Sequence, residues 1–406
     1  MTTNEHHSYD VIVVGARCAG SPTAMLLARH GYRVLVIDRA TFPSGTVSTH
    51  LLHAPAVAAL DRWGLLARVV ATGCPPIDPY SFDFGSVSIA GTPHPPPDGP
   101  ALAYAPRRTV LDEILVDAAV EAGAEVREGL TLDELLVDDG RVNGVRGRSV
   151  DGTAVVERAR VVVGADGVRS HVAKAVGASE YNTKPELQWA AYTYWRDLPV
   201  TGMETFIRPD RGFAALPTND DLTLVVVGWP AAEASAYRAD VEGNYLATLD
   251  MVPAFADRVR AATRVDRFHG GAVRNVFRSP YGPGWVLVGD AGYAKDPITA
   301  QGISDAFADA ERVTTALHDA FSGTRSFDDA LAAAQAARDR HALPIYEFTT
   351  QLATLAPPPP ELQQLFAAMA GNQHAQDAFV SVVAGTVSPA EFFDPTNLER
   401  LLAAAA

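Results

Sequence analysis

The sequence of 406 residues contains only two cysteines, Cys18 and Cys74. Two cysteines cannot build a disulfide framework or a cysteine-rich metal site, so we expect a reducing, cytoplasmic setting and no bound metal. The N-terminal residues lack the basic and apolar regions of a signal peptide, and every apolar run falls well short of the ~18 residues of a spanning helix. We therefore expect neither secretion nor a membrane-spanning segment.

Basic residues are also few, because 33 Lys and Arg oppose 48 Asp and Glu, which gives a formal charge of −15. Nucleic acids and anionic membrane surfaces both require clustered Lys and Arg, so neither is expected as a partner. Apolar residues are abundant at 48% of the chain, and this length suits roughly two to three domains with their own cores.

The first forty residues have the pattern of a βαβ unit. Two short apolar runs, VIVV and RVLVI, flank a glycine-bounded turn and a helical stretch, which is typical of buried parallel strands. The turn runs from Gly15 to Gly20, and Asp38 ends the second run. In a dinucleotide-binding fold such glycines let a pyrophosphate approach a helix N-terminus, and the acid binds a ribose. The alternative is a turn whose small residues only pack.

Arg17 stands where the dinucleotide pattern has its middle glycine. A side chain there weakens the expected backbone contact and could instead place a cation near a phosphate.

Two further strands are expected to end in an acid, Asp166 in VVVGADG and Asp290 in VLVGDA. At the carboxyl end of a parallel strand a carboxylate points into the ligand crevice, although Asp166 equally suits a simple Asp-Gly turn. A helix follows Pro297 to Gly302, and its free N–H groups suit a ring that accumulates negative charge. Asp296 is expected to lie in the preceding loop.

The remaining chain suggests two more parts, because strands of period two dominate the middle and helices dominate the end. We expect a discontinuous first domain of residues 1–77, 105–184 and 278–350, a second domain of residues 78–104 and 185–277, and a C-terminal helical segment of residues 351–406.

The three motifs, in this order and together with Arg108 in RRTVLD, resemble the FAD-dependent class A monooxygenases of the p-hydroxybenzoate hydroxylase fold. Their relatives, the geranylgeranyl reductases and flavin halogenases, share the pattern, which covers about residues 8–345. The resemblance implies an α/β fold with a Rossmann-like FAD-binding domain, a second, mainly antiparallel β-sheet substrate domain and a helical C-terminal region.

The resemblance also implies a non-covalent FAD and assigns residues to it. Gly15 and Gly20 would hold the pyrophosphate, Asp38 the adenosine ribose, Arg108 the flavin, Asp166 the pyrophosphate region, Asp290 the ribityl chain, and Gly302 with Ile303 the flavin pyrimidine, with Arg17, Ala19 and Arg39 as further cofactor-binding candidates. The chain departs from the family at Gly292-Tyr293, where Ala-His is common, and at Ala300, where a glycine is common.

A second glycine-rich βαβ unit is absent from the sequence, so NAD(P)H is expected only as a transient co-substrate. Halogenation is not expected, because the Trp-x-Trp-x-Ile-Pro segment of that group is absent and none of the three lysines lies early in the chain.

Three residues are candidates to face the substrate. His50 lies in a loop that, by resemblance, runs close to the flavin, where it could carry a proton with a pKa near ~6.5 or simply cap the next helix. Tyr192 and Tyr194 share one face of a predicted strand and could line the pocket or belong to the core.

The resemblance implies a monooxygenase of secondary metabolism in which NAD(P)H reduces the flavin and O2 forms a flavin hydroperoxide. That species would hydroxylate an aromatic or polyketide-like small molecule. Two alternatives stay open: a flavin-dependent reductase of an isoprenoid-type double bond, and a protein that holds FAD without turnover. The sequence does not specify the substrate, the preference for NADH or NADPH, or the oligomeric state.

Overall fold

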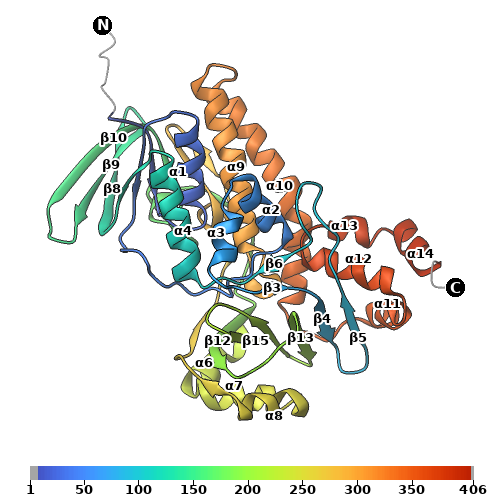
Figure 1. The fold of residues 1–406 in the computed structure, drawn as a ribbon. Coiled ribbons are helices and arrows are strands. Elements are labelled where there is room, and N and C mark those ends of the chain that lie inside the picture. Colours follow the sequence, from blue (N-terminus) through green and yellow to red (C-terminus); the bar gives the residue numbers. More distant parts are fainter. Residues whose placement is uncertain (1–7, 404–406) are drawn as a thin grey trace, which may run out of the picture.

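The computed structural model describes residues 8–403, which form two large sheets with helices around them (Figure 1). The first sheet has the order β19 (Tyr281–Gly282), β20 (Trp285–Leu287), β10 (Ala154–Gly164), β1 (Tyr9–Val14), β2 (Val34–Ile37), β7 (Glu125–Arg127). Strand β1 pairs in parallel with both neighbours, so that Val13 lies opposite Val163 and Val36. The apolar runs are therefore buried parallel strands, as the sequence predicts.

Helices cover this sheet because their apolar faces join its core. The main ones are α1 (Gly20–Arg29), α4 (Arg108–Glu121) and α9 (Gly302–Phe321), whose buried residues form one cluster with β1 and β2. Strand β10 leaves the sheet at its N-terminal half and pairs there with β9 (Arg141–Ser149), which pairs with β8 (Leu130–Asp138). Asp139 and Gly140 between them both have positive φ, 49° and 77°, as a two-residue hairpin turn demands.

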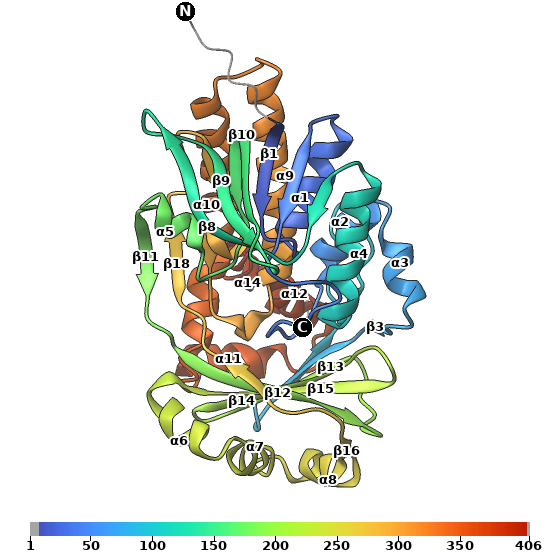
Figure 2. The same ribbon diagram turned by 90° about the vertical axis from the view of Figure 1, so that its left-hand side faces the viewer.

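The second sheet is antiparallel except where β13 runs parallel to β4. Its order is β16 (Thr263–Arg264), β12 (Gln188–Arg196), β15 (Leu222–Pro230), β14 (Arg211–Pro217), β13 (Met203–Arg208), β4 (Tyr80–Asp83), β5 (Ser88–Gly91), with β17 (His269–Gly271) beside β12. Trp189, Trp195 and Trp229 all lie on one face. They pack against three helices, α6 (Ala234–Ala239), α7 (Val241–Leu249) and α8 (Pro253–Ala261), which form the layer beneath the sheet in Figure 2.

Shorter elements connect the two sheets. They are α2 (Ala54–Arg62), α3 (Leu66–Ala71), the paired β3 (Pro76–Ile77) and β6 (Ala103–Tyr104), α5 (His171–Ala175), and the three-stranded sheet of β11 (Glu180–Lys184), β18 (Asn275–Arg278) and β21 (Tyr293–Ala294).

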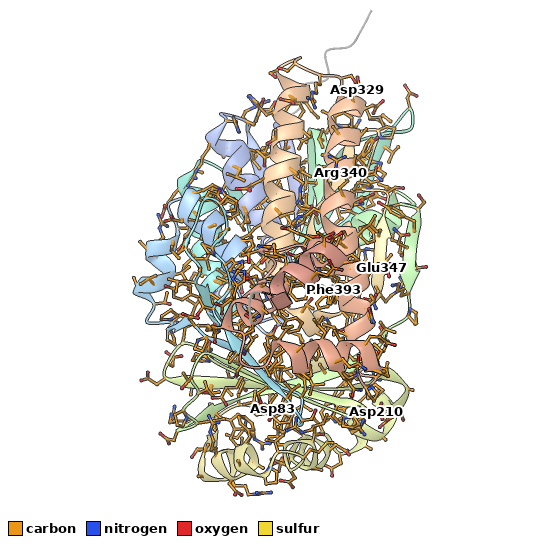
Figure 3. The ribbon with its side chains drawn as sticks, turned by 90° about the vertical axis from the view of Figure 1, so that its right-hand side faces the viewer. Asp83, Asp210, Asp329, Arg340, Glu347 and Phe393 are labelled. Atoms are coloured by element: carbon orange, nitrogen blue, oxygen red, sulfur yellow. The ribbon has the colours of Figure 1, made fainter. Side chains whose placement is uncertain are left out.

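The C-terminal part is helical, and it covers the second sheet. Helix α10 (Phe327–Leu352) is long enough to pass from the first sheet towards the second, as its residues Asp329, Arg340 and Glu347 show in Figure 3. The chain continues as α11 (Pro360–Met369), α12 (Gln373–Val383), α13 (Pro389–Phe392) and α14 (Pro395–Ala403). Phe366 and Phe379 of these helices share a buried cluster with Phe82 of β4.

The fold class expected from the sequence is thus confirmed, whereas the domain boundaries stay a proposal. Among the described helices, none combines the length and apolar character needed to cross a bilayer. Within residues 8–403, no group of three or more His, Cys, Asp or Glu side chains is arranged to hold a metal ion.

Candidate functional site

The three sequence motifs meet at the carboxyl ends of β1, β10 and β20. Gly15 has a φ of 106° and lies so close to Ala165 that a Cβ on it would be 2.8 Å from that carbonyl carbon. A Cβ on Gly20 would overlap the Gly15 carbonyl oxygen, and one on Gly289 would be 2.8 Å from the Ala19 Cβ. Contacts inside the protein therefore require these glycines.

Asp38 follows β2, and its carboxylate accepts hydrogen bonds from two neighbouring backbone N–H groups. Its Oδ2 accepts a hydrogen bond from Ala16 N at 2.7 Å, and its Oδ1 accepts one from Ala40 N at 2.8 Å. Each carboxylate oxygen has a second lone pair, so this half-buried side chain retains capacity for a ribose hydroxyl. Arg39 beside it is exposed.

Arg17 and Arg108 share one carboxylate, that of the fully buried Asp112. Arg108 donates to Asp112 Oδ1 at 2.8 Å, and Arg17 donates to Oδ2 at 2.6 Å and to the Ser44 hydroxyl at 2.8 Å. Two guanidinium groups against one carboxylate leave one net positive charge beside the glycine turn. Asp112 was missed in the sequence, where its only signal is the spacing of four from Arg108 on one helix.

Asp166 is occupied by the start of the short helix α5, whose N-cap is Ser170. Its Oδ1 accepts from the Ser170 hydroxyl at 2.5 Å, and its Oδ2 accepts from His171 N at 2.6 Å and Val172 N at 3.1 Å. These bonds satisfy the first N–H groups of α5, which is the structural role of an acid after a strand. A contact from Asp166 to the pyrophosphate region stays a prediction.

Asp290 contrasts with Asp166, because its carboxylate accepts no hydrogen bond from any described residue. The side chain is exposed, yet the pKa of its carboxyl is raised to about 6, chiefly because surrounding protein displaces water, while Lys295 lowers it. A carboxylate that is exposed to solvent on one side and surrounded by protein on the others lies in a recess. An unpartnered acceptor in a recess fits a ligand hydroxyl.

Gly302 begins α9 and is exposed, with Ile303 buried behind it. A Cβ on Gly302 would meet nothing within 4 Å, so no contact inside the protein requires glycine there. The free N–H groups of the first turn of this 20-residue helix are available to an anionic ring edge.

Asp296 lies in the loop between β21 and the short helix Pro297–Thr299, as expected, and its side chain is buried there. It caps the short helix Pro297–Thr299, and its Oδ1 accepts from Ile298 N at 3.0 Å and from Gln188 Nε2. Its Oδ2 is buried without a partner among the described residues, and burial raises the pKa of this carboxyl to about 7.

His50 is buried, with a φ of 64°, and its Nε2 is hydrogen-bonded to the Tyr194 hydroxyl. Burial lowers the pKa of His50 to about 3, and the nearby Arg108 and Arg107 lower it further. The expected ionisation near pH ~6.5 is therefore wrong for the folded protein. A catalytic role for His50 stays a prediction, now for a neutral imidazole.

Tyr192 and Tyr194 do share one face of β12, and both are buried against His50. The Tyr192 ring also stacks on His269 with 5.2 Å between centroids. Neither tyrosine lines the large cavity described next, although it opens over the same face of the strand. Their contact with substrate stays a prediction.

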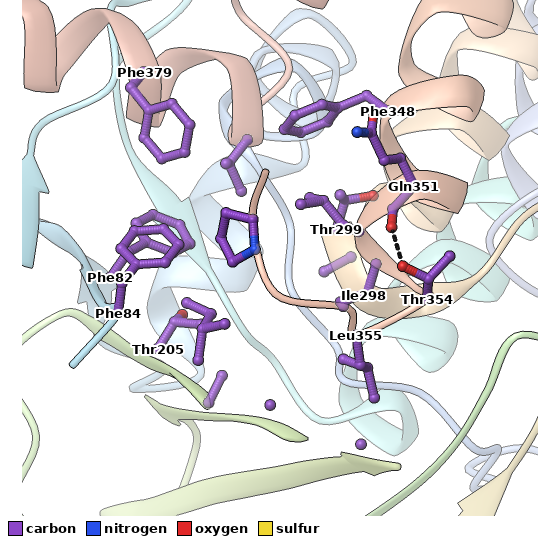
Figure 4. A pocket seen from close by; sticks show the side chains of 18 of the residues that line it. Phe82, Phe84, Thr205, Ile298, Thr299, Phe348, Gln351, Thr354, Leu355 and Phe379 are labelled. Carbon is purple, nitrogen blue, oxygen red and sulfur yellow. Dashed lines mark hydrogen bonds between the residues drawn. The ribbon is translucent and has the colours of Figure 1, made fainter. Parts of the chain in front are cut away.

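A cavity of about 1010 Å³ lies between the second sheet, α10 and the C-terminal helices. Its sheet side carries small residues, and phenylalanines from distant segments surround it, as Figure 4 shows for Phe82, Phe84, Phe348 and Phe379. The small residues are Ala190, Gly212, Ala214 and Gly228, and the other phenylalanines are Phe213, Phe366 and Phe393. Residues 297–300, which directly precede the start of α9, form part of the same lining.

His53 also lines the cavity, and sequence reasoning passed over it because no pattern marked it. Its Nε2 donates to the Thr299 carbonyl at 3.0 Å, so its Nδ1 accepts from the Tyr80 hydroxyl at 2.8 Å. Burial lowers the pKa of His53 to about 4, which keeps the ring neutral. This residue therefore ties α2, the third motif and β4 together.

The sequence matches the family described as FAD binding domain over residues 8–349. It is 32% identical over 321 residues to digeranylgeranylglycerophospholipid reductase 1 of Methanopyrus kandleri, covering 73% of this chain and 77% of that protein. It is 27% identical over 318 residues to 6-methylpretetramide 4-monooxygenase of Streptomyces rimosus, covering 74% and 73%.

The fold is similar to that of a myxobacterial chondrochloren halogenase, an FAD-dependent halogenase. The TM-score is 0.79 at 22% identity, over 98% of this chain and 97% of that one.

The described residues fit FAD. The close-packed turn of Gly15 and Gly20, the unpartnered Asp290 carboxylate and the open backbone at Gly302 offer contacts to its pyrophosphate, ribityl chain and ring edge. Together with the match over residues 8–349, this places the chain in the FAD-binding oxidoreductase family that contains the FAD-dependent monooxygenases and the geranylgeranyl reductase-like flavoproteins.

Proposed function

We propose that the protein is an FAD-dependent monooxygenase that hydroxylates an aromatic or polyketide-like small molecule, with NAD(P)H as transient electron donor. The observation that carries the proposal is the cavity of about 1010 Å³ whose lining includes residues 297–300. Those residues lead into Gly302, where the flavin ring edge is expected. A substrate in the cavity would lie beside the ring.

The lining supports this assignment because it is mainly apolar and aromatic. Phenylalanine rings bind flat aromatic molecules through offset or edge contacts and exclude water from them. Exclusion of water protects reactive intermediates from hydrolysis. FAD supplies the activation of oxygen when it is bound, and the chain supplies orientation and a dry pocket.

The residues that would hold FAD have distinct tasks in this proposal. Gly15 and Gly20 bring the backbone close to the pyrophosphate, and Asp38 holds the adenosine ribose. Asp290 accepts a hydrogen bond from the ribityl chain, and the N–H groups at Gly302 stabilise negative charge at the ring edge.

A second candidate is a reductase of an isoprenoid-type double bond, because the same apolar cavity suits an alkenyl chain. The Methanopyrus relative, at 32% identity, is named as a digeranylgeranylglycerophospholipid reductase, whereas the Streptomyces relative, at 27% identity, is named as a 6-methylpretetramide 4-monooxygenase. The two substrate classes are those that the family resemblance implies, and each of the two activities is represented by one of these relatives.

Oxygen dependence separates the two functions. The purified FAD-bound protein is mixed with NAD(P)H and panels of aromatic polyketides and isoprenoid lipids, in air and under argon. We expect one O2 and one NAD(P)H to be consumed for each product that gains one oxygen atom, and no product under argon.

Product that gains two hydrogens under argon would establish the reductase instead. Absence of NAD(P)H oxidation with every compound, in a preparation with full FAD content, would favour a protein that holds FAD without turnover.

A further inference from the structure

Gln188, the first residue of β12, brings an isolated polar group to the cavity. Its side chain lines the cavity and is only 4% exposed. Its Nε2 donates to the carboxylate of Asp296 behind it. Its Oε1 accepts no hydrogen bond from the described residues, and it is not among the side-chain oxygens that are sealed from solvent.

Asp296 determines which end of the Gln188 amide faces it. Asp296 Oδ1 also accepts from the backbone N–H of Ile298 at 3.0 Å. A backbone N–H can only donate, so Oδ1 acts as an acceptor whether or not the other oxygen carries a proton. With Asp296 ionised, or with its proton on Oδ2, the amide directs its NH2 group to Oδ1 and leaves Oε1 as the free end.

Gly228 on the neighbouring strand leaves the space that Oε1 occupies. A Cβ on Gly228 would overlap Gln188 Oε1, so even alanine would displace the amide. Gly228 itself lines the cavity, next to Ala190, its partner on β12. Three segments, β12, β15 and the turn after β21, thus hold one carbonyl oxygen beside an apolar surface.

A nearly buried acceptor without a partner loses its hydrogen bond to water and gains none. We propose that Gln188 Oε1 accepts a hydrogen bond from a hydroxyl or N–H on the substrate, with Asp296 as the positioning residue, so that the cavity selects planar ring systems that carry such a donor. This rests on the proposed function only in assigning the cavity to the substrate. The hydroxyl or N–H of the substrate donates to Gln188 Oε1, and the small residues Ala190, Gly212 and Ala214 leave room for the flat ring.

The test uses binding to the oxidised FAD-bound protein, so it does not depend on turnover. The probes are 2-hydroxyphenanthrene and 2-methoxyphenanthrene, which have the same flat rings but differ in the donor. Dissociation constants are measured by fluorescence titration. We expect the wild type to bind the hydroxy probe about 3- to 10-fold more tightly, as one net hydrogen bond provides.

Four variants separate positioning from general damage. Gln188→Leu and Gly228→Ala should both remove the preference, the first by deleting the acceptor and the second by displacing it. Asp296→Leu should also remove it, because the amide loses its anchor. Asp296→Asn should keep it, because an amide oxygen can still accept from Ile298 N–H and Gln188 Nε2.

FAD content and thermal unfolding check that each variant is folded, and a variant that fails this check is set aside in favour of the other three. Thr205→Val is the matched control, because Thr205 is another polar residue of the cavity lining. The proposal is overturned if the wild type shows no preference or binds neither probe, if Gln188→Leu retains the preference, or if Thr205→Val alone abolishes it. Oxygen uptake that fails with every substrate would count against the proposed function and leave this result intact.

Discussion

Small residues have opposite uses in two regions of this molecule. At the FAD-binding turn, Gly15, Gly20 and Gly289 each face other protein atoms at distances that no Cβ can share. At the start of α9 and on the sheet side of the cavity, Gly302 and Gly212 face open space or ordinary contacts. The glycines of the FAD-binding turn allow segments of the chain to pack against one another. The glycines at the start of α9 and on the cavity wall leave space for a bound molecule.

The same contrast holds for the acids at the strand ends. Asp166 is satisfied entirely by Ser170 and the first turn of α5, whereas Asp290 has no partner among the described residues. The type of a residue therefore does not distinguish a structural position from a ligand-binding one, whereas the contacts that the residue makes do.

The largest effect is expected for Gly20→Ala. The new Cβ would overlap the Gly15 carbonyl oxygen and lie 3.1 Å from the Ala165 Cβ, so three segments would have to move apart. We expect the free energy of unfolding to fall by about 3 kcal/mol or more in a denaturant titration. Gly302→Ala is the matched control and should leave stability nearly unchanged; equal losses in both variants would contradict the distinction.

Asp290→Ala should weaken FAD binding about 10- to 150-fold, which corresponds to ~1.5–3 kcal/mol for a lost hydrogen bond to a carboxylate. Its stability without FAD should change little, because no described residue bonds to the carboxylate. Isothermal titration of the apoprotein with FAD measures the first quantity and thermal unfolding the second.

Asp166→Ala provides the comparison for that experiment. It should cost about 0.5–2 kcal/mol of stability through the lost hydrogen bonds at the start of α5, with a smaller loss of FAD affinity. A loss of FAD affinity as large as that of Asp290→Ala would show that Asp166 contacts the pyrophosphate region after all.

Gly302→Val should fold normally and retain FAD, because a Cβ at this exposed position meets no protein atom within 4 Å. It should instead push the ring edge away from the N-terminus of α9, which weakens a stabilisation of reduced flavin worth about 0.3–2 kcal/mol. We expect slower flavin reduction and a more negative midpoint potential. An unchanged potential would show that this helix end does not face the flavin.

The smallest effect at neutral pH is expected for His50→Asn. The pKa of His50 is about 3 in the folded protein and near ~6.5 in the unfolded chain, so below that value only the unfolded chain takes up the proton. Wild-type stability should therefore fall as pH drops from ~6.5 towards 4, and this residue contributes up to ~1.4 kcal/mol per pH unit.

In His50→Asn the contribution of His50 to the pH dependence of the free energy of unfolding should disappear. FAD content and the shape of the pH–rate profile near pH 6.5 should stay unchanged. Unfolding curves at several pH values measure the difference. His53, whose pKa is lowered to about 4, should retain its own share and serves as an internal reference. An ionisation near pH 6.5 that the substitution removes from the rate profile would restore His50 as an ionising proton carrier.

The FAD-binding part of the fold could be predicted from the sequence. Short stretches of sequence mark the apolar runs of β1, β2 and β10, the turn from Gly15 to Gly20 and the acids after the strands, and each of these features depends on local geometry. The alternation in β12 likewise placed Tyr192 and Tyr194 on one face before any contact was known.

The partners of such residues depend on how distant segments pack together, which the sequence pattern does not show. Asp112 between two arginines, Asp296 buried behind Gln188 and His53 between Thr299 and Tyr80 join segments up to 246 residues apart. The cavity depends on the same kind of contact, because its phenylalanines come from distant segments that include β4, β14, α10, α11 and α12. Periodicity tells which face of an element is apolar, but the packing of distant elements determines what that face meets and how far burial moves a pKa.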